Sequence, residues 1–593
     1  MTGIIKRILL PAALLLAAIS SLAQGKSLHE LQQEFVDLRF GMFVHFGLPT
    51  YQDADWTDPD LDPKVFNPVK LDTRQWVETA RSAGATFICV SVKHHAGFCM
   101  WDTATTDYSV MHTPLGRDVL RELTDALQEA GMQVMFHFSI LDTHHRIRPT
   151  LPFTPEKTEF IKAQLRELLT LYGPVNTIMF DGWDAPWGRI SYEDVSFPEI
   201  YHFIKSIQPN CLVMDLNGAK YPQEALFYSD IRCYEQGAGQ KISPEVNRLP
   251  AMACYPLQRT WFWKDSFPTD TLKDVEAIVR DNLIPYNEAY CTYILNAAPN
   301  RDGLIDPNAV AAFRRIGELW KNTGHIADVP VSMEPITDIN IAAGRPCDSS
   351  WSDDMNLMDF ANDDNFHTAW VSSPQVKEPW WKVDLDGATP IDMVVITEAE
   401  GSAMAGYRVE TLLNGVWTEV ARSGGESGRV HICRFPAAMA ESVRIRFSPG
   451  EGSLAIAEVC VSQRYAPPVE EIPISADEEV SATTLIVIVD NGIGKEPLRR
   501  AVRKYGAKII YDYKIVPGMA IKIPEGDDIL KAMAYFEKVE GVVSVQRDKI
   551  TRLTDPVPVK EMYLTRPIKE NSPISRELDS SGAPDKGVRR SFL

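Results

Sequence analysis

Histidine and aspartate side chains end several consecutive apolar segments in the first third of the chain. A lone histidine in such a place is usually a core or loop residue, but four successive segments that all end on His or Asp are far less expected by chance. The residues are His45, His94, His95, His137 and Asp181. Such an array offers hydrogen bonds to several hydroxyl groups, and tryptophans close by in sequence offer ring faces for C–H surfaces. The pattern therefore suits the binding of a sugar.

The same side chains are also able to bind a metal ion, because imidazole and carboxylate groups are zinc ligands. The candidate set is His94, His95, His137, His144, His145 and Asp181. The spacings typical of histidine metal sites, HxH and HExxH, do not occur in these motifs. A metal-dependent hydrolase is therefore an alternative to the sugar site and the less favoured of the two.

Strand and helix patterns that must position these groups alternate from about residue 30 to residue 325. Apolar segments typical of buried strands cover 41–46, 86–93, 133–138, 177–180, 211–216, 231–234 and 291–296. Between them lie amphipathic patterns that end at glycine, such as 119–130 before Gly131. This alternation predicts a (β/α)₈ barrel, in which catalytic groups sit just past the C-terminal ends of the strands. A doubly wound open sheet is the alternative, but no glycine-rich phosphate loop supports it.

Seven blocks of this region resemble glycoside hydrolase family 29, the α-L-fucosidases. They are RFGMFVHFG (39–47), AGATFICVSVKHHAGFCMWDT (83–103), TDYSV (106–110), GRDVLREL (116–123), SILDTHHR (139–146), LYGPVNTIMFDGW (171–183) and YILNAAPNRDGLID (293–306). The blocks stand in family order and are distributed from residue 39 to residue 306. The resemblance implies a retaining mechanism with two carboxyl groups, in which Asp181 is the nucleophile.

The resemblance also points to the residues around the sugar. The candidates for substrate binding are His45, Asp55, Trp56, His94, His95, Trp101, His137 and Trp183. It implies that the first three of the histidines bind fucose hydroxyls and that His137 lies near the nucleophile, whereas Trp101 packs either on the sugar or on the rim of the barrel. The chain departs from the family pattern at Asp55, where Glu is usual, at Ala96, where Asp is common, and at Met179, where Trp is common. These departures leave the subsite preference open.

A second carboxyl group must protonate the leaving oxygen. Glu235 is the favoured candidate because it follows a predicted strand, 54 residues after Asp181. Glu245, in a Ser-Pro-Glu sequence similar to the Thr-Pro-Glu of some members, is the alternative. The resemblance thus implies a retaining exo-α-L-fucosidase that removes terminal α-linked L-fucose from oligosaccharides or glycoconjugates without a cofactor. A catalytically inactive carbohydrate-binding protein on the same barrel is a further alternative.

Composition and the N-terminal segment constrain partners and location. The 593 residues carry a formal net charge of -20, which disfavours nucleic acid as a partner. Residues 1–23 have the pattern of a signal peptide, with Lys6 and Arg7 before an apolar run and a small-x-small site at 21–23. We therefore expect a periplasmic or secreted protein. No later apolar run reaches the roughly 18 residues of a membrane span, so no membrane anchor is expected.

After the predicted catalytic domain at 28–330, the segment 335–463 resembles a discoidin-like (coagulation factor C-type) β-sandwich. The matching sequences are ANDDNFHTAW (361–370), PWWKVDLDG (379–387), YRVETLLNGVWTEVA (407–421) and VRIRF (443–447). Similar domains often bind carbohydrate through loop aromatics, for which Trp370, Trp380 and Trp381 are candidates, and sometimes hold a structural calcium ion; a purely structural appendage is the alternative. Cys347 and Cys460 bracket the domain and are candidates for a disulfide.

The remainder of the chain divides into three parts. Residues 464–482 form a Pro-rich acidic linker. Residues 483–552 show a βαββαβ order that predicts a ferredoxin-like domain and weakly resembles subtilisin-prosegment-like modules. Residues 553–593 lack apolar periodicity and are expected to be disordered.

Overall fold

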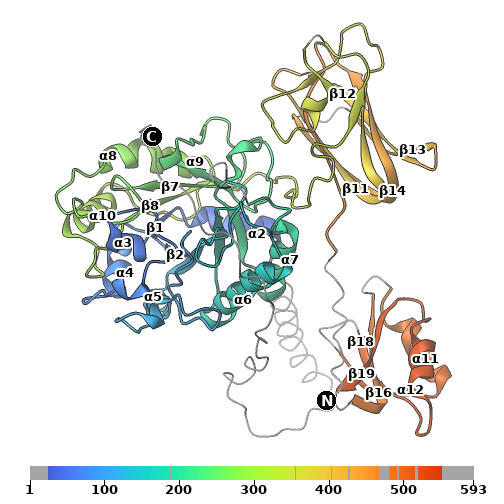
Figure 1. Cartoon of the computed structure of the whole chain (residues 1–593), viewed down its shortest axis with the longest axis horizontal. Coiled ribbons are helices and arrows are strands. Elements are labelled where there is room, and N and C mark those ends of the chain that lie inside the picture. Colours follow the sequence, from blue (N-terminus) through green and yellow to red (C-terminus); the bar gives the residue numbers. More distant parts are fainter. Residues whose placement is uncertain are drawn as a thin grey trace, which may run out of the picture. The chain divides into compact units, whose positions relative to one another are not determined.

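The computed structural model describes residues 25–549, except for 186–187, 189, 354, 403, 425–427, 467–479, 491–492 and 514–517. The predicted signal peptide, most of the predicted linker and the predicted disordered tail lie outside the described residues. The chain divides into two compact units, residues 1–468 and residues 469–593. The first unit contains a barrel and an all-β domain, and the second contains a small α+β domain (Figure 1).

Eight parallel strands form the barrel in the order β5-β4-β3-β2-β1-β8-β7-β6. They are β1 Phe40–Val44, β2 Phe87–Lys93, β3 Gln133–Ser139, β4 Thr177–Asp181, β5 Leu212–Asp215, β6 Arg232–Glu235, β7 Ala251–Pro256 and β8 Cys291–Asn296. The predicted barrel is confirmed, and all seven predicted strands are present. The sequence pattern missed β7, because AMACYP is rich in small residues and ends in proline and so carries a weak strand signal.

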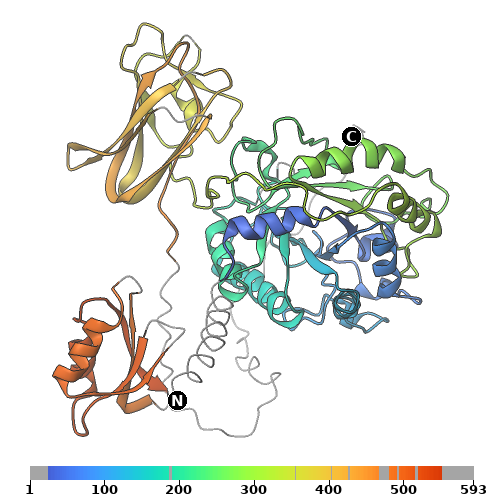
Figure 2. The same cartoon turned by 180° about the vertical axis from the view of Figure 1, so that it is seen from behind.

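Helices surround the barrel strands (Figure 2), and the first of them packs Leu31, Phe35 and Val36 against the inner core of the barrel. They are α2 Leu28–Asp37, α3 Leu48–Gln52, α4 Thr73–Ser82, α5 Val119–Ala130, α6 Pro155–Leu171, α7 Phe197–Ile207, α8 Val275–Ile278, α9 Ile284–Glu288 and α10 Pro307–Leu319. A π-helical segment, Val279–Leu283, joins α8 to α9. In α5, Asp118 caps the first turn by accepting a hydrogen bond from the Arg121 amide, and Gly131 ends the helix at φ 66°.

Two apolar layers hold the barrel together. The outer layer lies between strands and helices and includes Ile88, Phe136 and Ile178. The inner layer fills the barrel with side chains that point inward from the strands, namely Phe43, Cys89, Met135, Met179, Met214, Met252, Cys254 and Ile294. Close packing explains Gly41, because a Cβ atom there would lie 2.3 Å from the ring of Phe87. The barrel is therefore a packed core that supports its polar rim.

The barrel is open along one seam, between β5 and β6. These strands stand at the two ends of the hydrogen-bonded order and do not pair with each other. No α-helix follows β5 or β6 among the described residues; the connections contain only the short 3₁₀ turns η3 Gly218–Lys220 and η4 Gln236–Ala238. The all-β domain packs here, with the Phe366 ring 5.4 Å from Tyr221 and 5.6 Å from Phe227. At this seam the all-β domain thus covers the barrel, as helices do around the other strands.

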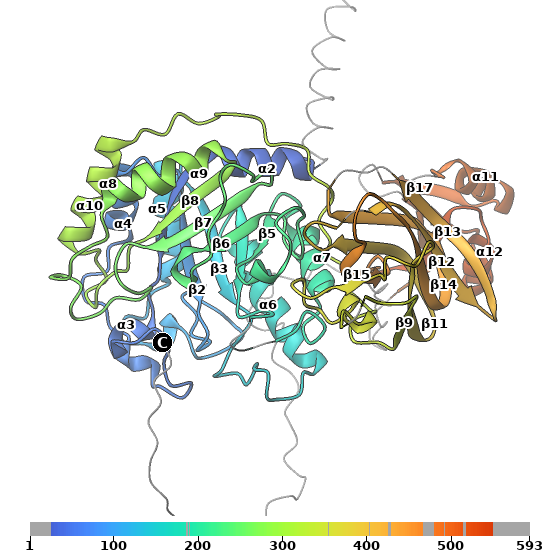
Figure 3. The ribbon, with the colours of Figure 1, turned by 90° about the horizontal axis from the view of Figure 1, so that it is seen from above.

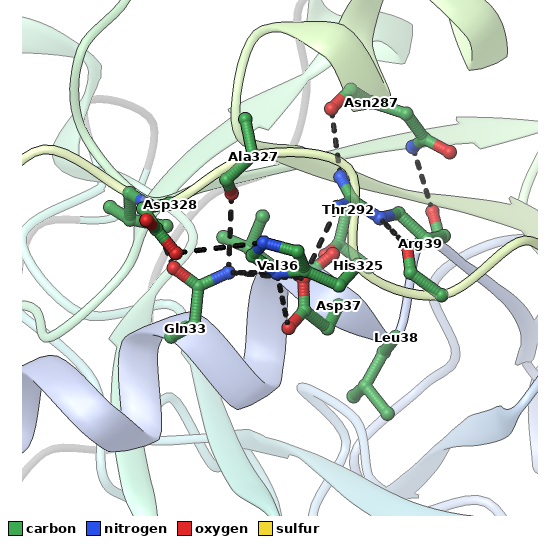
Figure 4. Close-up of polar contacts among 12 residues, drawn as sticks. Gln33, Val36, Asp37, Leu38, Arg39, Asn287, Thr292, His325, Ala327 and Asp328 are labelled. Atoms are coloured by element: carbon green, nitrogen blue, oxygen red, sulfur yellow. Dashed lines mark hydrogen bonds and ion pairs between the residues drawn. The ribbon is translucent and has the colours of Figure 1, made fainter.

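The segment that leaves the barrel after α10 is fastened to the first helix. It runs across the barrel past α2 (Figure 3). The buried guanidinium of Arg39 donates to the carbonyls of Gly324 and Asn287 at 2.7 and 2.8 Å and pairs with Asp37 at 3.2 Å. His325 also lies 3.2 Å from Asp37, as Figure 4 shows. One buried cation therefore joins the start and the end of the barrel domain.

The all-β domain is built on one antiparallel hydrogen-bonded network of seven strands. Its strands are β9 Cys347–Ser349, β10 Trp370–Val371, β11 Trp380–Glu398, β12 Met404–Leu413, β13 Val416–Gly424, β14 Val430–Pro449 and β15 Ala455–Ser462. Cys347 and Cys460, the candidates for a disulfide, are free thiols. They pair with Val383 and Val395 of β11 respectively, twelve residues apart along one strand, too far for the roughly 6 Å Cα separation of a disulfide.

The tryptophans proposed for sugar binding in this domain are mostly core residues. Trp370 and Trp381 are fully buried, and Trp381 donates its indole N–H to the Met358 carbonyl. Trp380, on the alternate face of β11, is partly exposed. Among the described residues, the most exposed tryptophan is Trp351, at 74%. The domain therefore uses two of the three candidates for packing.

The second unit contains β16 Val480–Val489, α11 Glu496–Tyr505, β17 Lys508–Asp512, β18 Gly518–Lys522, α12 Ile529–Phe536 and β19 Val542–Lys549. This is the βαββαβ order expected from the sequence. The sheet order is β17-β18-β16-β19, and its core includes Leu485, Leu498, Ile521 and Phe536. None of the described helices combines the length and apolar character that a membrane-spanning helix requires.

The clamp around Arg39 leads to a prediction about stability. Replacing Arg39 with Met leaves two buried carbonyls without their donor and Asp37 without its buried partner, so we expect the free energy of unfolding to fall by about 3 kcal/mol. Denaturant unfolding followed by tryptophan fluorescence measures this change. Arg74→Met is the control, since Arg74 forms an exposed pair with Glu129, and it is expected to leave the midpoint in place. Equal midpoints for both variants would contradict the assigned role of Arg39.

Candidate active site

A pocket of about 420 Å³ lies where the C-terminal ends of the barrel strands meet. Its lining residues are Phe43, His45, Asp55, Trp56, His94, His95, His137, Asp181, Leu216, Glu235, Cys254 and Trp261. Residues from β1, β2, β3, β4 and β6 meet here because parallel strands in a barrel present their carboxyl ends at one rim. The site thus brings together all four predicted histidines, Asp181 and Glu235.

Asp181 is the last residue of β4 and is 7% exposed. Its Oδ1 accepts hydrogen bonds from the Gly182 amide at 2.6 Å and from the Asn217 side-chain amide at 3.1 Å. Its Oδ2 lies 3.2 Å from His137 Nε2 and 3.6 Å from His95 Nε2. Burial acts to raise the pKa of Asp181, but these imidazoles outweigh burial and hold that pKa well below its usual range. The carboxylate is therefore ionised and fixed in orientation.

The hydrogen-bond network assigns different proton positions to the histidines. Because a carboxylate only accepts, His137 donates from Nε2 to Asp181, and its Nδ1 lies 3.0 Å from the Ser91 hydroxyl. His95 is reversed: the Ser139 hydroxyl donates to the Leu141 carbonyl, so His95 Nδ1 must donate to Ser139, at 2.8 Å. The Nε2 atom of His95 is then an acceptor on the pocket side.

His45 has the same arrangement as His95. The Asn296 amide donates its N–H to the Trp261 carbonyl, so its oxygen accepts from His45 Nδ1 at 2.8 Å. Burial lowers the pKa of His45 to about 3 and that of His95 to about 4, and the pKa of His94 is also well below its usual value. These rings are uncharged at neutral pH, and His45 and His95 present lone pairs that suit the O–H groups of a sugar.

Glu235, at the end of β6, has the opposite electrostatic character to Asp181. Burial and the nearby negative charge of Asp181 raise the pKa of Glu235 to about 7, although a hydrogen bond from Trp261 acts to lower it. Near neutral pH a substantial fraction of Glu235 is therefore protonated. One pocket thus holds an ionised carboxylate and a carboxylic acid, the pair that acid-assisted nucleophilic cleavage needs.

Aromatic rings form the wall of the pocket. Trp56 is half exposed, and its ring centroid lies 4.4 Å from that of His95. Trp261 lies 5.1 Å from His45, centroid to centroid. Trp261 was missed by the sequence analysis because β7, which precedes it, was not recognised; the cluster Trp-Phe-Trp at 261–263 was the available signal. Asp55 supports this wall, since it pairs with Lys264 at 3.1 Å and accepts a hydrogen bond from the Phe262 amide.

Comparison with known families identifies this architecture. Residues 50–325 match the family model described as Alpha-L-fucosidase. The barrel belongs to the α-L-fucosidase family. Residues 360–445 match the model described as a NedA-like, galactose-binding domain, in agreement with the discoidin-like resemblance of the all-β domain.

Individual relatives show the extent of the similarity. The chain is 26% identical over 421 residues to Alpha-L-fucosidase 1 of Arabidopsis thaliana, and the match covers 66% of this chain and 79% of the plant protein. The Tissue alpha-L-fucosidase of Mus musculus is 23% identical over 313 residues, or 46% of this chain and 66% of the mouse protein. Among solved structures, Alpha-L-fucosidase isoenzyme 1 from Paenibacillus thiaminolyticus is 22% identical, with a TM-score of 0.44, and covers 72% of this chain and 100% of that one.

Three predicted site residues lie elsewhere in the fucosidase fold. Trp101 and Trp183 are fully buried and do not line the pocket; their indole N–H groups donate to Glu167 and to the Val195 carbonyl. These rings support the loops behind the rim, so their assignment to the substrate is corrected. Glu245 is exposed on the β6–β7 connection, where its backbone carbonyl accepts from Arg248. It is absent from the pocket lining, which leaves Glu235 as the candidate acid.

The metal alternative concerns the same pocket. Within the described part of the chain, the one compact group of three such ligands is His94, His95 and Asp181, whose ligand atoms lie within 4.8 Å of one another. A cation there would take the lone pairs of Asp181 and of the histidines that face the sugar. Metal binding and the proposed sugar chemistry would therefore compete for the same atoms.

Proposed function

We propose that this protein is a retaining exo-α-L-fucosidase that hydrolyses terminal α-linked L-fucose. The observation that carries the proposal is that two carboxyl groups in one pocket of an α-L-fucosidase-family barrel have opposite protonation states. Asp181 is held ionised by hydrogen bonds and imidazoles, whereas burial and the charge of Asp181 keep Glu235 protonated near neutral pH. A pocket of 420 Å³ suits a single sugar ring, as exo-cleavage requires.

The reaction then proceeds in two displacements. Asp181 Oδ attacks the anomeric carbon while the bond to the leaving oxygen breaks, and Glu235 transfers its proton to that oxygen. In the second step the Glu235 carboxylate takes a proton from water, whose oxygen attacks the same carbon and releases Asp181. The neutral rings of His45 and His95 accept hydrogen bonds from the sugar hydroxyls, and His137 keeps Asp181 oriented.

An inactive carbohydrate-binding protein is the remaining alternative. Binding alone gives no reason to keep a buried carboxylate and a protonated carboxyl group side by side, because each costs free energy to bury. Catalysis uses both. We also propose, from the N-terminal sequence, that the protein acts in the periplasm or outside the cell on fucosylated glycans.

Variants of the two carboxyl groups test the mechanism. We expect Asp181→Ala to lose at least about 10³-fold in kcat on an aryl α-L-fucoside, because the covalent step is removed. Glu235→Ala is expected to lose about 10²–10⁴-fold on fucosylated oligosaccharides, whose leaving groups need a proton. On the aryl α-L-fucoside, whose leaving group departs without a proton, azide is expected to restore turnover in both variants, giving α-fucosyl azide with Glu235→Ala and β-fucosyl azide with Asp181→Ala.

Glu245→Ala is the matched control and is expected to retain wild-type rates. Nuclear magnetic resonance of the azide products assigns the anomeric configuration. If wild-type protein binds fucosylated glycans but releases no fucose from any of them, the binding-protein alternative holds and the mechanism is wrong.

The raised pKa of Glu235 predicts a specific pH profile. The free enzyme must carry the proton on Glu235, so we expect kcat/KM for an oligosaccharide to fall as pH rises through about 7. Above that value the loss approaches tenfold per pH unit. In Glu235→Gln this alkaline limb should disappear, measured with an aryl fucoside whose leaving group needs no protonation. A limb that persists unchanged in the variant would assign the ionisation to another group.

We further propose a structural calcium site in the all-β domain. Asp363 accepts a hydrogen bond from the Thr368 hydroxyl, and the buried carboxylate of Glu458 accepts one from the Asp364 amide. Burial and the charges of Asp364 and Asp363 raise the pKa of Glu458 well above its usual range. Carboxylate oxygens are the ligands that calcium prefers, and a cation here would offset the negative charges around Glu458.

Removing metal ions with a chelator tests the proposed calcium site independently of the pocket. We expect EDTA to lower the thermal unfolding midpoint and to leave initial rates of fucose release unchanged at about 25 °C, since the catalytic steps above need no metal. Added calcium should restore the midpoint. Rapid loss of activity in EDTA, reversed by zinc but not by calcium, would favour the metal-dependent hydrolase instead.

A further inference from the structure

One short loop connects the pocket to the all-β domain. It follows β5 and contains Asn217, whose side chain donates to Asp181, and Lys220, three residues later. The Lys220 ammonium lies 2.6 Å from an Asp184 carboxylate oxygen and 2.8 Å from one of Asp364. Asp184 belongs to the turn just after the nucleophile, whereas Asp364 belongs to the all-β domain. Lys220 is therefore a bridge between two domains that ends next to the catalytic aspartate.

The segment between Asn217 and Lys220 is too short to move freely. It forms the 3₁₀ turn η3, with Asn217 as the residue that precedes it. The Asn217 amide donates to Asp215, which also accepts the Tyr192 hydroxyl at 2.9 Å. Displacement of Lys220 is thus transmitted to Asn217, and from there to the hydrogen bond on Asp181.

The all-β side of the bridge is equally well held. The Asp364 amide donates to the buried Glu458, and two residues later Phe366 packs on Tyr221 and Phe227. Tyr221 directly follows Lys220, so the ion pairs and the ring contacts act on the same point of the loop. The open seam between β5 and β6 leaves this loop without the helix that would support it elsewhere in the barrel.

The charge of Lys220 is essential to this arrangement. It separates two carboxylates, and Asp184 is only 2% exposed. Removing the ammonium takes away the group that contacts both Asp184 and Asp364 at hydrogen-bonding distance in a partly desolvated place, where charge interactions are poorly screened. The loss therefore weakens the link between the catalytic turn and the all-β domain at this loop.

We propose that Lys220 is a positioning residue for the nucleophile, through which the all-β domain holds the Asn217 hydrogen bond on Asp181. The proposal rests on the fucosidase activity proposed above. It gives the accessory domain a part in catalysis that involves no contact with the sugar.

Kinetics of matched variants test this role. In Lys220→Met we expect kcat on an aryl α-L-fucoside to fall about 10- to 100-fold, because small displacements of a reacting group are costly, with KM changed less than about threefold. The acid limb of the kcat/KM profile should move to higher pH, since Asp181 loses a donor to its ionised form. Lys220→Arg keeps the charge and is expected to restore most of kcat. Asp364→Asn should show a smaller loss in the same direction.

Arg429→Met is the control at the same junction. Arg429 pairs with Glu224, on the same connection after β5, and with Glu400 of the all-β domain, but it does not touch the catalytic turn. We expect Arg429→Met to have the same thermal unfolding midpoint as Lys220→Met. Its kcat, in contrast, should equal that of the wild type. Should Lys220→Met fail to fold, Lys220→Arg and Asp364→Asn carry the comparison.

The outcomes distinguish this inference from the proposed function. An inactive wild type with intact folding would overturn the proposed function. An active wild type, with kcat and acid limb unchanged in Lys220→Met and Asp364→Asn, would overturn the positioning role alone. An equal loss of kcat in Arg429→Met would also overturn it, because the loss would then come from any weakening of the contact between the barrel and the all-β domain, not from Lys220 in particular.

Discussion

The rest of this structure depends on keeping one carboxylate ionised in a nearly buried place. An uncompensated charge at such a depth costs several kcal/mol, and Asp181 is compensated by two amide donors and the Nε2 of His137. Those donors come from the turn after β4, the loop after β5 and the third strand. The barrel rim is therefore organised around a charge, which the hydrogen-bond donors around Asp181 stabilise.

The same charge decides what its neighbours do. Burial and this charge together raise the pKa of Glu235 to about 7 and so make an acid of a group that would be ionised in water. The charge also orders the histidines, because His137 turns its N–H toward Asp181 while His45 and His95 are tied through Nδ1 to Asn296 and Ser139. Two carboxyl groups with ordinary intrinsic acidity thereby acquire opposite roles from their surroundings.

The open seam gives the accessory domain a structural reason to be where it is. The loop after β5 carries Asn217 and has no covering helix, so its support comes from Phe366 and Asp364 of the all-β domain. Lys220 joins that support to the turn after the nucleophile. An appended domain can thus affect chemistry by holding a loop that the barrel itself leaves uncovered.

By itself the sequence determined the features that depend on local pattern. Periodicity and strand-end residues revealed seven barrel strands, the four histidines and Asp181. Side-chain alternation and helix stops depend only on residues that are close together in the sequence, so they can be recognised without the fold. The sequence pattern failed at β7, and hence at Trp261, where small residues and a proline hide the strand. Tertiary structure alone decided the rest. Trp56 faces the pocket while Trp101, Trp183, Trp370 and Trp381 are buried, since the direction of an aromatic ring depends on what packs against it. The proposal of Glu235 rather than Glu245 as the acid likewise rests on burial and on the charge of Asp181, which act on Glu235 only in the folded protein.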